Sequence, residues 1–171
     1  MLVRIRPYET DDIPRAFEAA KQSYVELSPF MPWCHADYSI EETRSWITER
    51  IAAFAARTDY CFAVVSGDDG TLLGGCGPSG IDTANRRANL GYWIRTDATR
   101  RGAATTATRL LADWAFEHTA LARLEIVTAI DNAASRRVAE KVGAFREGVA
   151  RSRLLLRGAM HDAVIFSIVR G

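Results

Sequence analysis

Long apolar runs, clustered cysteines and an excess of one charge are all missing from this chain of 171 residues. No apolar stretch approaches the ~20 residues that a membrane-spanning helix needs, so we expect no membrane partner. The 22 basic and 21 acidic residues leave a formal net charge of +1. Because no global field then attracts nucleic acid or an anionic membrane, we expect neither as a partner, and any anion site must be local.

The three cysteines, Cys34, Cys61 and Cys76, are odd in number and far apart, without a Cys-x-x-Cys pair. The segment Cys34–Asp37 contains metal-ligating residue types, but no second ligand cluster accompanies it, so we expect no metal. The first six residues alternate like a strand and lack the apolar core of a signal peptide. The sequence therefore predicts a cytoplasmic protein.

The length suits one domain with a substantial core, and we expect a single domain over residues 1–171. Alternating apolar residues predict strands near 2–6, 60–66, 71–79, 88–95, 123–130, 145–157 and 161–169. Helical spacing predicts helices near 11–27, from the capping box at Ser39, near 102–118 and near 132–142. This order, βααβββαβαββ, predicts an α/β (α+β) fold in which a mixed sheet carries helices on both faces.

The segment Thr99–Thr105 joins a predicted strand to an amphipathic helix. The first N–H groups of a helix have no partner within it, and the helix dipole favours negative charge there. Small residues let a phosphate approach the backbone, and neighbouring arginines add charge. We therefore predict a diphosphate site formed by Arg100, Arg101, Gly102, Ala103, Ala104 and Thr105.

This segment has a simpler interpretation as well, because small residues at a helix start are common and an Arg-Arg pair usually faces solvent. It is not a Walker loop, since no Lys-Ser or Lys-Thr follows the glycine, and two glycines of a dinucleotide fingerprint are missing. A nucleotide-binding protein is therefore a weaker alternative.

Further motifs follow in a characteristic order. They are Leu90–Ile94, the turn Arg100–Thr105, the segment Asp131–Gly143, Arg146-Glu147-Gly148 and His161-Asp162. In this order and spacing the chain resembles the GNAT superfamily of N-acetyltransferases, in the branch typified by the RimJ/RimL acetylases of ribosomal-protein N-termini. The resemblance covers nearly the whole chain, and it implies a GNAT-like, mostly antiparallel sheet and acetyl-CoA as the acetyl-donor cosubstrate.

The resemblance also implies roles for individual residues. The pyrophosphate of acetyl-CoA lies on the helix start at Gly102–Thr105, and its pantetheine arm runs beside the strand 88–95, bonded to backbone groups around Trp93, Ile94 and Arg95. Asn132 contacts the arm through its amide. Ser135 lies one helical turn further on, near the sulfur, where its hydroxyl stabilises or protonates the leaving thiolate.

Four positions depart from the family pattern. In the phosphate loop, Thr99 stands where Arg or Gln is usual, and Arg100 stands where a second glycine is common. Asn89 stands where a glutamate often precedes Leu-Gly-Tyr-Trp, and Ala139 replaces a tyrosine that other GNAT branches use as general acid. Asp162, His35 and Asp37 are candidate bases, although each is more simply explained as a structural or surface polar residue. Phe30, Met31 and Trp33 are candidates for the wall of an acceptor cleft, or simply core residues.

The predicted function is direct transfer of an acetyl group from acetyl-CoA to a primary amine, with Ser135 as the catalytic residue. The acceptor is a protein N-terminal amine or a small molecule such as a polyamine or an antibiotic, because a fold does not fix the acceptor. A catalytically inactive CoA-binding regulatory module is the alternative from another class. A monomer and a homodimer are both compatible with the sequence.

Overall fold

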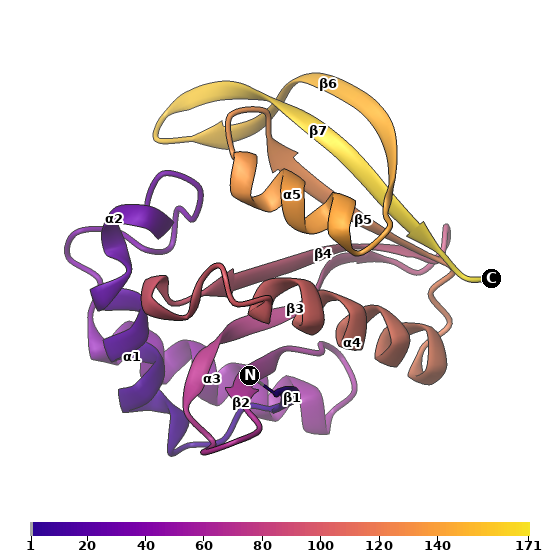
Figure 1. Cartoon of the computed structure of the whole chain (residues 1–171). Helices are drawn as coiled ribbons and strands as arrows, with labels where there is room; N and C mark the ends of the chain where they lie inside the picture. Colours follow the sequence, from indigo (N-terminus) through magenta and orange to yellow (C-terminus); the bar gives the residue numbers. More distant parts are fainter. Residues whose placement is uncertain (1) are drawn as a thin grey trace.

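The structure is a computed structural model that describes residues 2–171. A single seven-stranded sheet runs through the molecule (Figure 1), in the spatial order β1-β2-β3-β4-β5-β7-β6. The strands are β1 (Val3–Pro7), β2 (Phe62–Ser66), β3 (Leu72–Asp82), β4 (Arg87–Ile94), β5 (Arg123–Ala129), β6 (Phe145–Leu156) and β7 (Ala159–Val169). The helices are α1 (Asp12–Gln22), α2 (Tyr24–Leu27), α3 (Ile40–Ala55), α4 (Ala103–His118) and α5 (Ala133–Lys141), with a 3-10 turn η1 (Thr96–Ala98).

Only the pairing of β4 with β5 is parallel, and the other five pairings between described strands are antiparallel. The helix between β4 and β5 makes this parallel pair possible, because parallel neighbours need a crossover connection. The predicted mixed, mostly antiparallel sheet is confirmed.

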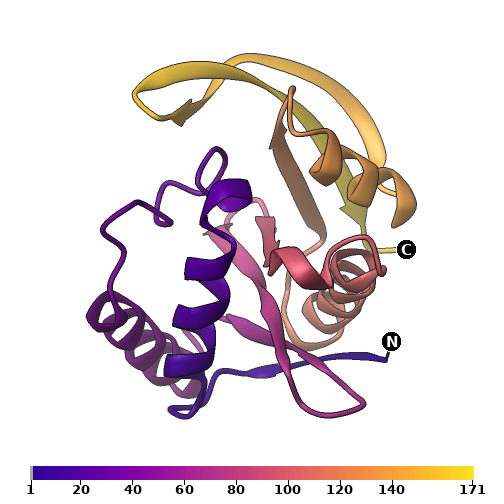
Figure 2. The ribbon, with the colours of Figure 1, turned by 60° about the vertical axis from the view of Figure 1, so that its left-hand side comes forward.

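Helices cover both faces of the sheet, as predicted (Figure 2). On one face, Ile13 and Ala16 of α1 and Ile47 of α3 pack against Ala63 and Leu72. On the other face the core is larger and is formed by α4, α5 and the central strands. Its buried residues include Val64, Leu90, Ile94, Ala107, Leu111, Leu124, Ala139 and Phe166. Between residues 2 and 171, no helix is long and apolar enough to cross a membrane.

The predicted helix over residues 11–27 is interrupted at Ser23, which corrects the sequence-based boundary. The buried Ser23 hydroxyl donates to the carbonyl of Ala19 and accepts a hydrogen bond from the backbone N–H of Thr96 at 2.9 Å. A serine that bonds back to residue i−4 bends a helix. The break therefore turns α2 away from α1 and ties both helices to the turn that follows β4.

Candidate active site

The sheet opens between its two parallel strands. β4 and β5 pair over only three residues, from Arg87↔Arg123 to Asn89↔Glu125. Beyond Asn89, β4 continues along β3 to Ile94, while β5 continues along β7. The β4 edge from Leu90 onward therefore has no partner strand on the β5 side among the described residues. An internal strand edge of this kind can hold an extended ligand through backbone hydrogen bonds.

The ladder with β3 decides which backbone groups face this opening. Arg95 donates its N–H to Leu73, and its carbonyl accepts from Ala98, so its backbone is not free. Because hydrogen-bonded and non-hydrogen-bonded pairs alternate in an antiparallel ladder, the backbone of Trp93 also faces β3. Tyr92 and Ile94 then face the opening. The predicted cosubstrate contacts around Trp93, Ile94 and Arg95 stay a prediction; of these three residues, Ile94 is the one whose backbone groups face the opening.

The start of α4 lies close in the chain to the end of this open edge. Gly102 is the N-cap in a left-handed conformation (φ 85°), and no side chain caps the helix. The first intrahelical bond runs from Thr106 N–H to the Gly102 carbonyl, so the N–H groups of Ala103, Ala104 and Thr105 are left without intrahelical partners. This geometry can bind a phosphate, because a glycine here admits close approach to these amides.

Arg100 and Arg101 border the same turn and are both exposed. Neither forms an ion pair with any residue from 2 to 171. Arg95, in contrast, is engaged with Asp97 through two hydrogen bonds of 2.6 and 2.9 Å. Two cations without acidic partners beside free helix amides make this turn suitable for a doubly charged anion.

Asn132 and Ser135 begin α5. The Asn132 side-chain oxygen accepts the N–H of Ser135 at 3.0 Å and so caps the helix. The capping role belongs to Asn132 and not to Ser135, whose hydroxyl lies 2.9 Å from the hydroxyl of Tyr92. The Tyr92 hydroxyl also lies 3.2 Å from the Ser135 carbonyl, which is an alternative acceptor for its single proton. The Ser135 hydroxyl is therefore held by a residue of β4, the strand whose edge is open.

Burial raises the pKa of Tyr92 to about 12, although the hydrogen bond with Ser135 acts in the opposite direction. Tyr92 is accordingly a neutral phenol near neutral pH. When its one proton goes to the Ser135 hydroxyl oxygen and not to the Ser135 carbonyl, the Ser135 proton is free to point elsewhere. The pair can thus present one hydroxyl proton to a neighbouring group.

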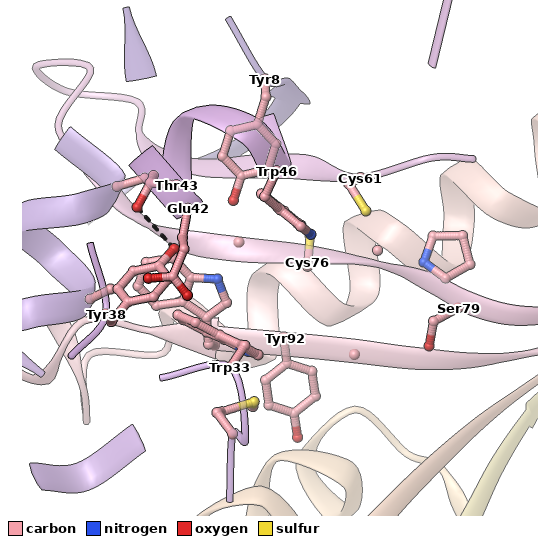
Figure 3. Close-up of a pocket in the computed structure, with 18 of the residues that line it drawn as sticks. Tyr8, Trp33, Tyr38, Glu42, Thr43, Trp46, Cys61, Cys76, Ser79 and Tyr92 are labelled. Atoms are coloured by element: carbon pink, nitrogen blue, oxygen red, sulfur yellow. Dashed lines mark hydrogen bonds between the residues drawn. The ribbon is translucent and has the colours of Figure 1, made fainter. Parts of the chain in front are cut away.

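A cavity of about 540 Å3 lies between the sheet and the segments that lead into α3 (Figure 3). Met31 and Trp33 line it, whereas Phe30 is not among the lining residues, and their role in binding an acceptor stays a prediction. Tyr92 lines it as well. The cavity therefore reaches the residue of β4 whose hydroxyl contacts Ser135. Its position allows an acceptor to meet a thioester at β4.

Of the three candidate bases, His35 is the one that lines this cavity, and neither Asp37 nor Asp162 is among the lining residues. His35 Nε2 lies 2.9 Å from a carboxylate oxygen of Glu42. Hydrogen bonds from Ser39, followed by the one from His35, lower the pKa of Glu42. Asp162 instead accepts the backbone N–H of Ser152 at 2.9 Å, which is a structural role in the hairpin of β6 and β7.

A profile of the family described as "Acetyltransferase (GNAT) domain" matches residues 3–144. The chain belongs to the GNAT acetyltransferases. Among curated GNAT relatives, the "Putative ribosomal N-acetyltransferase YdaF" of Bacillus subtilis is 39% identical over 102 residues, which are 60% of this chain and 56% of that protein. The "Probable N-acetyltransferase YjcK" of the same organism is 31% identical over 77% of this chain and 74% of its own length.

Solved GNAT structures have the same fold. A "Probable acetyltransferase" is 31% identical, with a TM-score of 0.88 over 98% of this chain and 93% of its own. Mycobacterium smegmatis RimJ, solved "in complex with CoA-disulfide", is 25% identical, with a TM-score of 0.87 over 98% of this chain and 81% of its own. The resemblance to the GNAT superfamily and the predicted fold are thereby confirmed.

The structure shows the surroundings of two departures from the GNAT pattern, Asn89 and Ala139. Asn89 accepts the N–H of Val127 at 3.3 Å across β4 and β5, at the point where these strands separate. Ala139 is fully buried in the core under α5. No hydroxyl or carboxylate therefore comes from either position.

Sequence reasoning missed Tyr92 as a partner of Ser135 and Glu42 as a residue of the cavity. Glu42 was visible only as the end of the Ser39 capping box, which the structure confirms. Tyr92 shares one face of β4 with Ala88, Leu90 and Ile94, and this face packs against α4 and α5. Its contact with Ser135 joins residues 43 positions apart, which no local pattern reveals.

Proposed function

We propose that this GNAT protein transfers an acetyl group from acetyl-CoA to a primary amine, with a protein N-terminal amine as the first acceptor class. The observation that carries the proposal is the open β4 edge, which leads toward a helix start with free amides and two unpaired arginines. Its curated relative YdaF is named as a ribosomal N-acetyltransferase, which favours a protein acceptor. Acetyl-CoA, when bound, supplies an acetyl group activated as a thioester.

The backbone groups of Tyr92 and Ile94 hold the extended arm of the cosubstrate, and the amides of Ala103–Thr105 bind its diphosphate. A backbone N–H of the open β4 edge also donates to the carbonyl oxygen as negative charge develops there. Held in this way, the carbonyl carbon faces the cavity that admits the amine, and positioning supplies much of the acceleration.

Ser135 acts when the thioester bond breaks. As the amine nitrogen forms its bond to the acetyl carbon and the carbon–sulfur bond breaks, the Ser135 hydroxyl donates a hydrogen bond or its proton to the departing sulfur. Tyr92 donates its own proton to the Ser135 hydroxyl oxygen, so the Ser135 proton points toward the sulfur and not toward Tyr92. The amine loses its own proton to His35, whose contact with the Glu42 carboxylate stabilises the imidazolium that forms.

Release of the CoA thiol with a panel of amines tests this function. The panel includes peptides with ribosomal-protein N-terminal sequences, polyamines and aminoglycosides, with each amine omitted as the control. We expect amine-dependent thiol release with at least one peptide. Thiol release that no amine accelerates, in a protein that binds acetyl-CoA, contradicts the enzymatic proposal.

That outcome supports the second candidate, a CoA-binding regulatory module without catalysis, for which the missing carboxylate at Asn89 and the missing hydroxyl at Ala139 are the motivation. The cytoplasmic location, the absence of a metal, and the choice between monomer and homodimer remain predictions from the sequence.

A further inference from the structure

The floor of the 540 Å3 cavity consists of glycines. Gly75 and Gly77 lie two residues apart on β3, and Gly91 on β4 pairs directly with Gly77. Side chains alternate between the two faces of a strand, so these three positions share one face of the sheet. The Tyr8 hydroxyl and the Trp93 indole cover Gly75, and the Tyr60 carbonyl covers Gly77. Of the three glycines, only Gly91 has open space above it.

The walls of the cavity are aromatic and held in place by one another. The ring of Trp33 lies 5.6 Å from that of Trp93 and 5.6 Å from that of Tyr38. Tyr8 and Trp46 meet edge to face at 5.3 Å. Figure 3 shows Tyr8 and Trp46 on one side of β3 and β4, with Trp33 and Tyr38 close together near Glu42. A glycine floor between aromatic walls forms a flat apolar slot.

Negative charge is scarce in this slot. Glu42 is the single carboxylate among the lining residues. Its oxygens already accept the N–H and the hydroxyl of Ser39, both at 2.9 Å, and contact His35. A polycation needs several anionic partners when it leaves water, and the lining offers only this one, which is already engaged.

Resting on the proposed function, we propose that the preferred acceptor is a primary amine with a bulky apolar group, aromatic or branched aliphatic, directly beside it. This group lies over Gly91, where the floor is open, and contacts the aromatic walls. Small N-terminal residues leave the slot empty, and polyamines bring charges that it does not match. Gly91 is then the residue that sets the acceptor size, because it borders Tyr92.

The expected preference follows from apolar burial. Burying a Phe or Leu side chain favours the transition state by roughly tenfold to a hundredfold in kcat/KM over an acceptor without it. This ratio corresponds to about 1.4–2.8 kcal/mol. Acceptors that differ only in this side chain isolate the effect, and the amides of phenylalanine, leucine, alanine and glycine form such a series, with spermidine as the polycation.

Gly91 permits a graded test of the floor. A Cβ at this position meets only the Gly77 carbonyl at 3.8 Å, an ordinary contact, so Gly91→Ala and Gly91→Val leave the strand intact. Gly75 and Gly77 are unsuitable, because a Cβ there lies 2.2 Å from the Tyr8 hydroxyl or 2.8 Å from the Tyr60 carbonyl. The dissociation constant of acetyl-CoA and a melting curve accompany each variant.

In the wild type we expect phenylalanine and leucine amides to exceed glycine amide by at least tenfold in kcat/KM. We expect this kcat/KM ratio to be smaller in Gly91→Ala and to fall below threefold in Gly91→Val. Equal kcat/KM values across the series, a preference for spermidine, or a ratio that Gly91→Val leaves unchanged overturns the proposal. If the wild type binds acetyl-CoA but acetylates no amine, the proposed function itself fails, and this inference fails with it.

Discussion

Replacing Gly102 by valine should have two effects. It should destabilise the fold through backbone strain, and it should weaken acetyl-CoA binding at the start of α4. Gly102 has φ 85°, and left-handed backbone costs an L-residue about 1–2 kcal/mol, more for a β-branched one. In a domain of this size we expect the melting temperature to fall by about 2–8 °C. The valine methyl groups also occupy the approach to the amides of Ala103 and Ala104, so the Kd of acetyl-CoA should rise at least tenfold, or about 1.4 kcal/mol.

Gly143 provides a matched control. It ends α5 with φ 84°, and a Cβ there has no atom within 4 Å, as is true of Gly102. Gly143→Val therefore bears the same backbone strain away from the proposed diphosphate site. Calorimetric titration measures the Kd of acetyl-CoA for each variant, and a melting curve measures its stability. We expect both variants to lose stability, but only Gly102→Val to bind acetyl-CoA more weakly. If both raise the Kd equally, or if Gly102→Val leaves it unchanged in a folded protein, the phosphates bind elsewhere and our reasoning is refuted.

Three further predictions concern single side chains. Ser135→Ala should lower kcat by on the order of tenfold to a hundredfold with little change in acetyl-CoA affinity or in melting temperature, because the Asn132 cap binds a backbone N–H that alanine keeps; a less stable variant with unchanged turnover would leave Ser135 a structural role. Tyr92→Phe should lower kcat by about tenfold in the wild type and by less than twofold in the Ser135→Ala background; independent losses in the double variant would show that Tyr92 does not act through Ser135. Glu147 accepts two hydrogen bonds from Arg123, both at 2.6 Å, which lower its pKa from 4.5 to about 2. The carboxylate therefore stabilises the fold above pH 4.5. The melting-temperature difference between wild type and Glu147→Gln should shrink as the pH falls from 4.5 toward 2. A difference that does not change with pH would show that the Glu147–Arg123 pair does not cause it.

Local chemistry explains which parts of the fold were predictable. The capping box at Ser39 is set by neighbouring residues, and it appears where the sequence indicates. The break of the first helix at Ser23 depends on a hydrogen bond from Thr96, a residue far along the chain. No local pattern could therefore place it.

The candidate site divides in the same way. The free amides at the α4 start follow from the turn around Gly102, which sequence reasoning identified. The glycine floor requires the register that pairs Gly77 with Gly91, and the hydroxyl contact of Tyr92 with Ser135 requires the packing of α5 on β4. Both depend on how distant strands and helices meet, which composition and periodicity do not determine.

Amide hydrogen exchange in the presence of acetyl-CoA tests the central claim most directly, because it reports on individual backbone groups. Our account predicts that acetyl-CoA slows exchange at Tyr92 and Ile94 on the open edge of β4 and at Ala103, Ala104 and Thr105 at the start of α4, and that ATP at the same concentration does not protect the β4 amides. Saturating acetyl-CoA that leaves both groups of amides unprotected, or equal protection of the β4 edge by ATP, would contradict it.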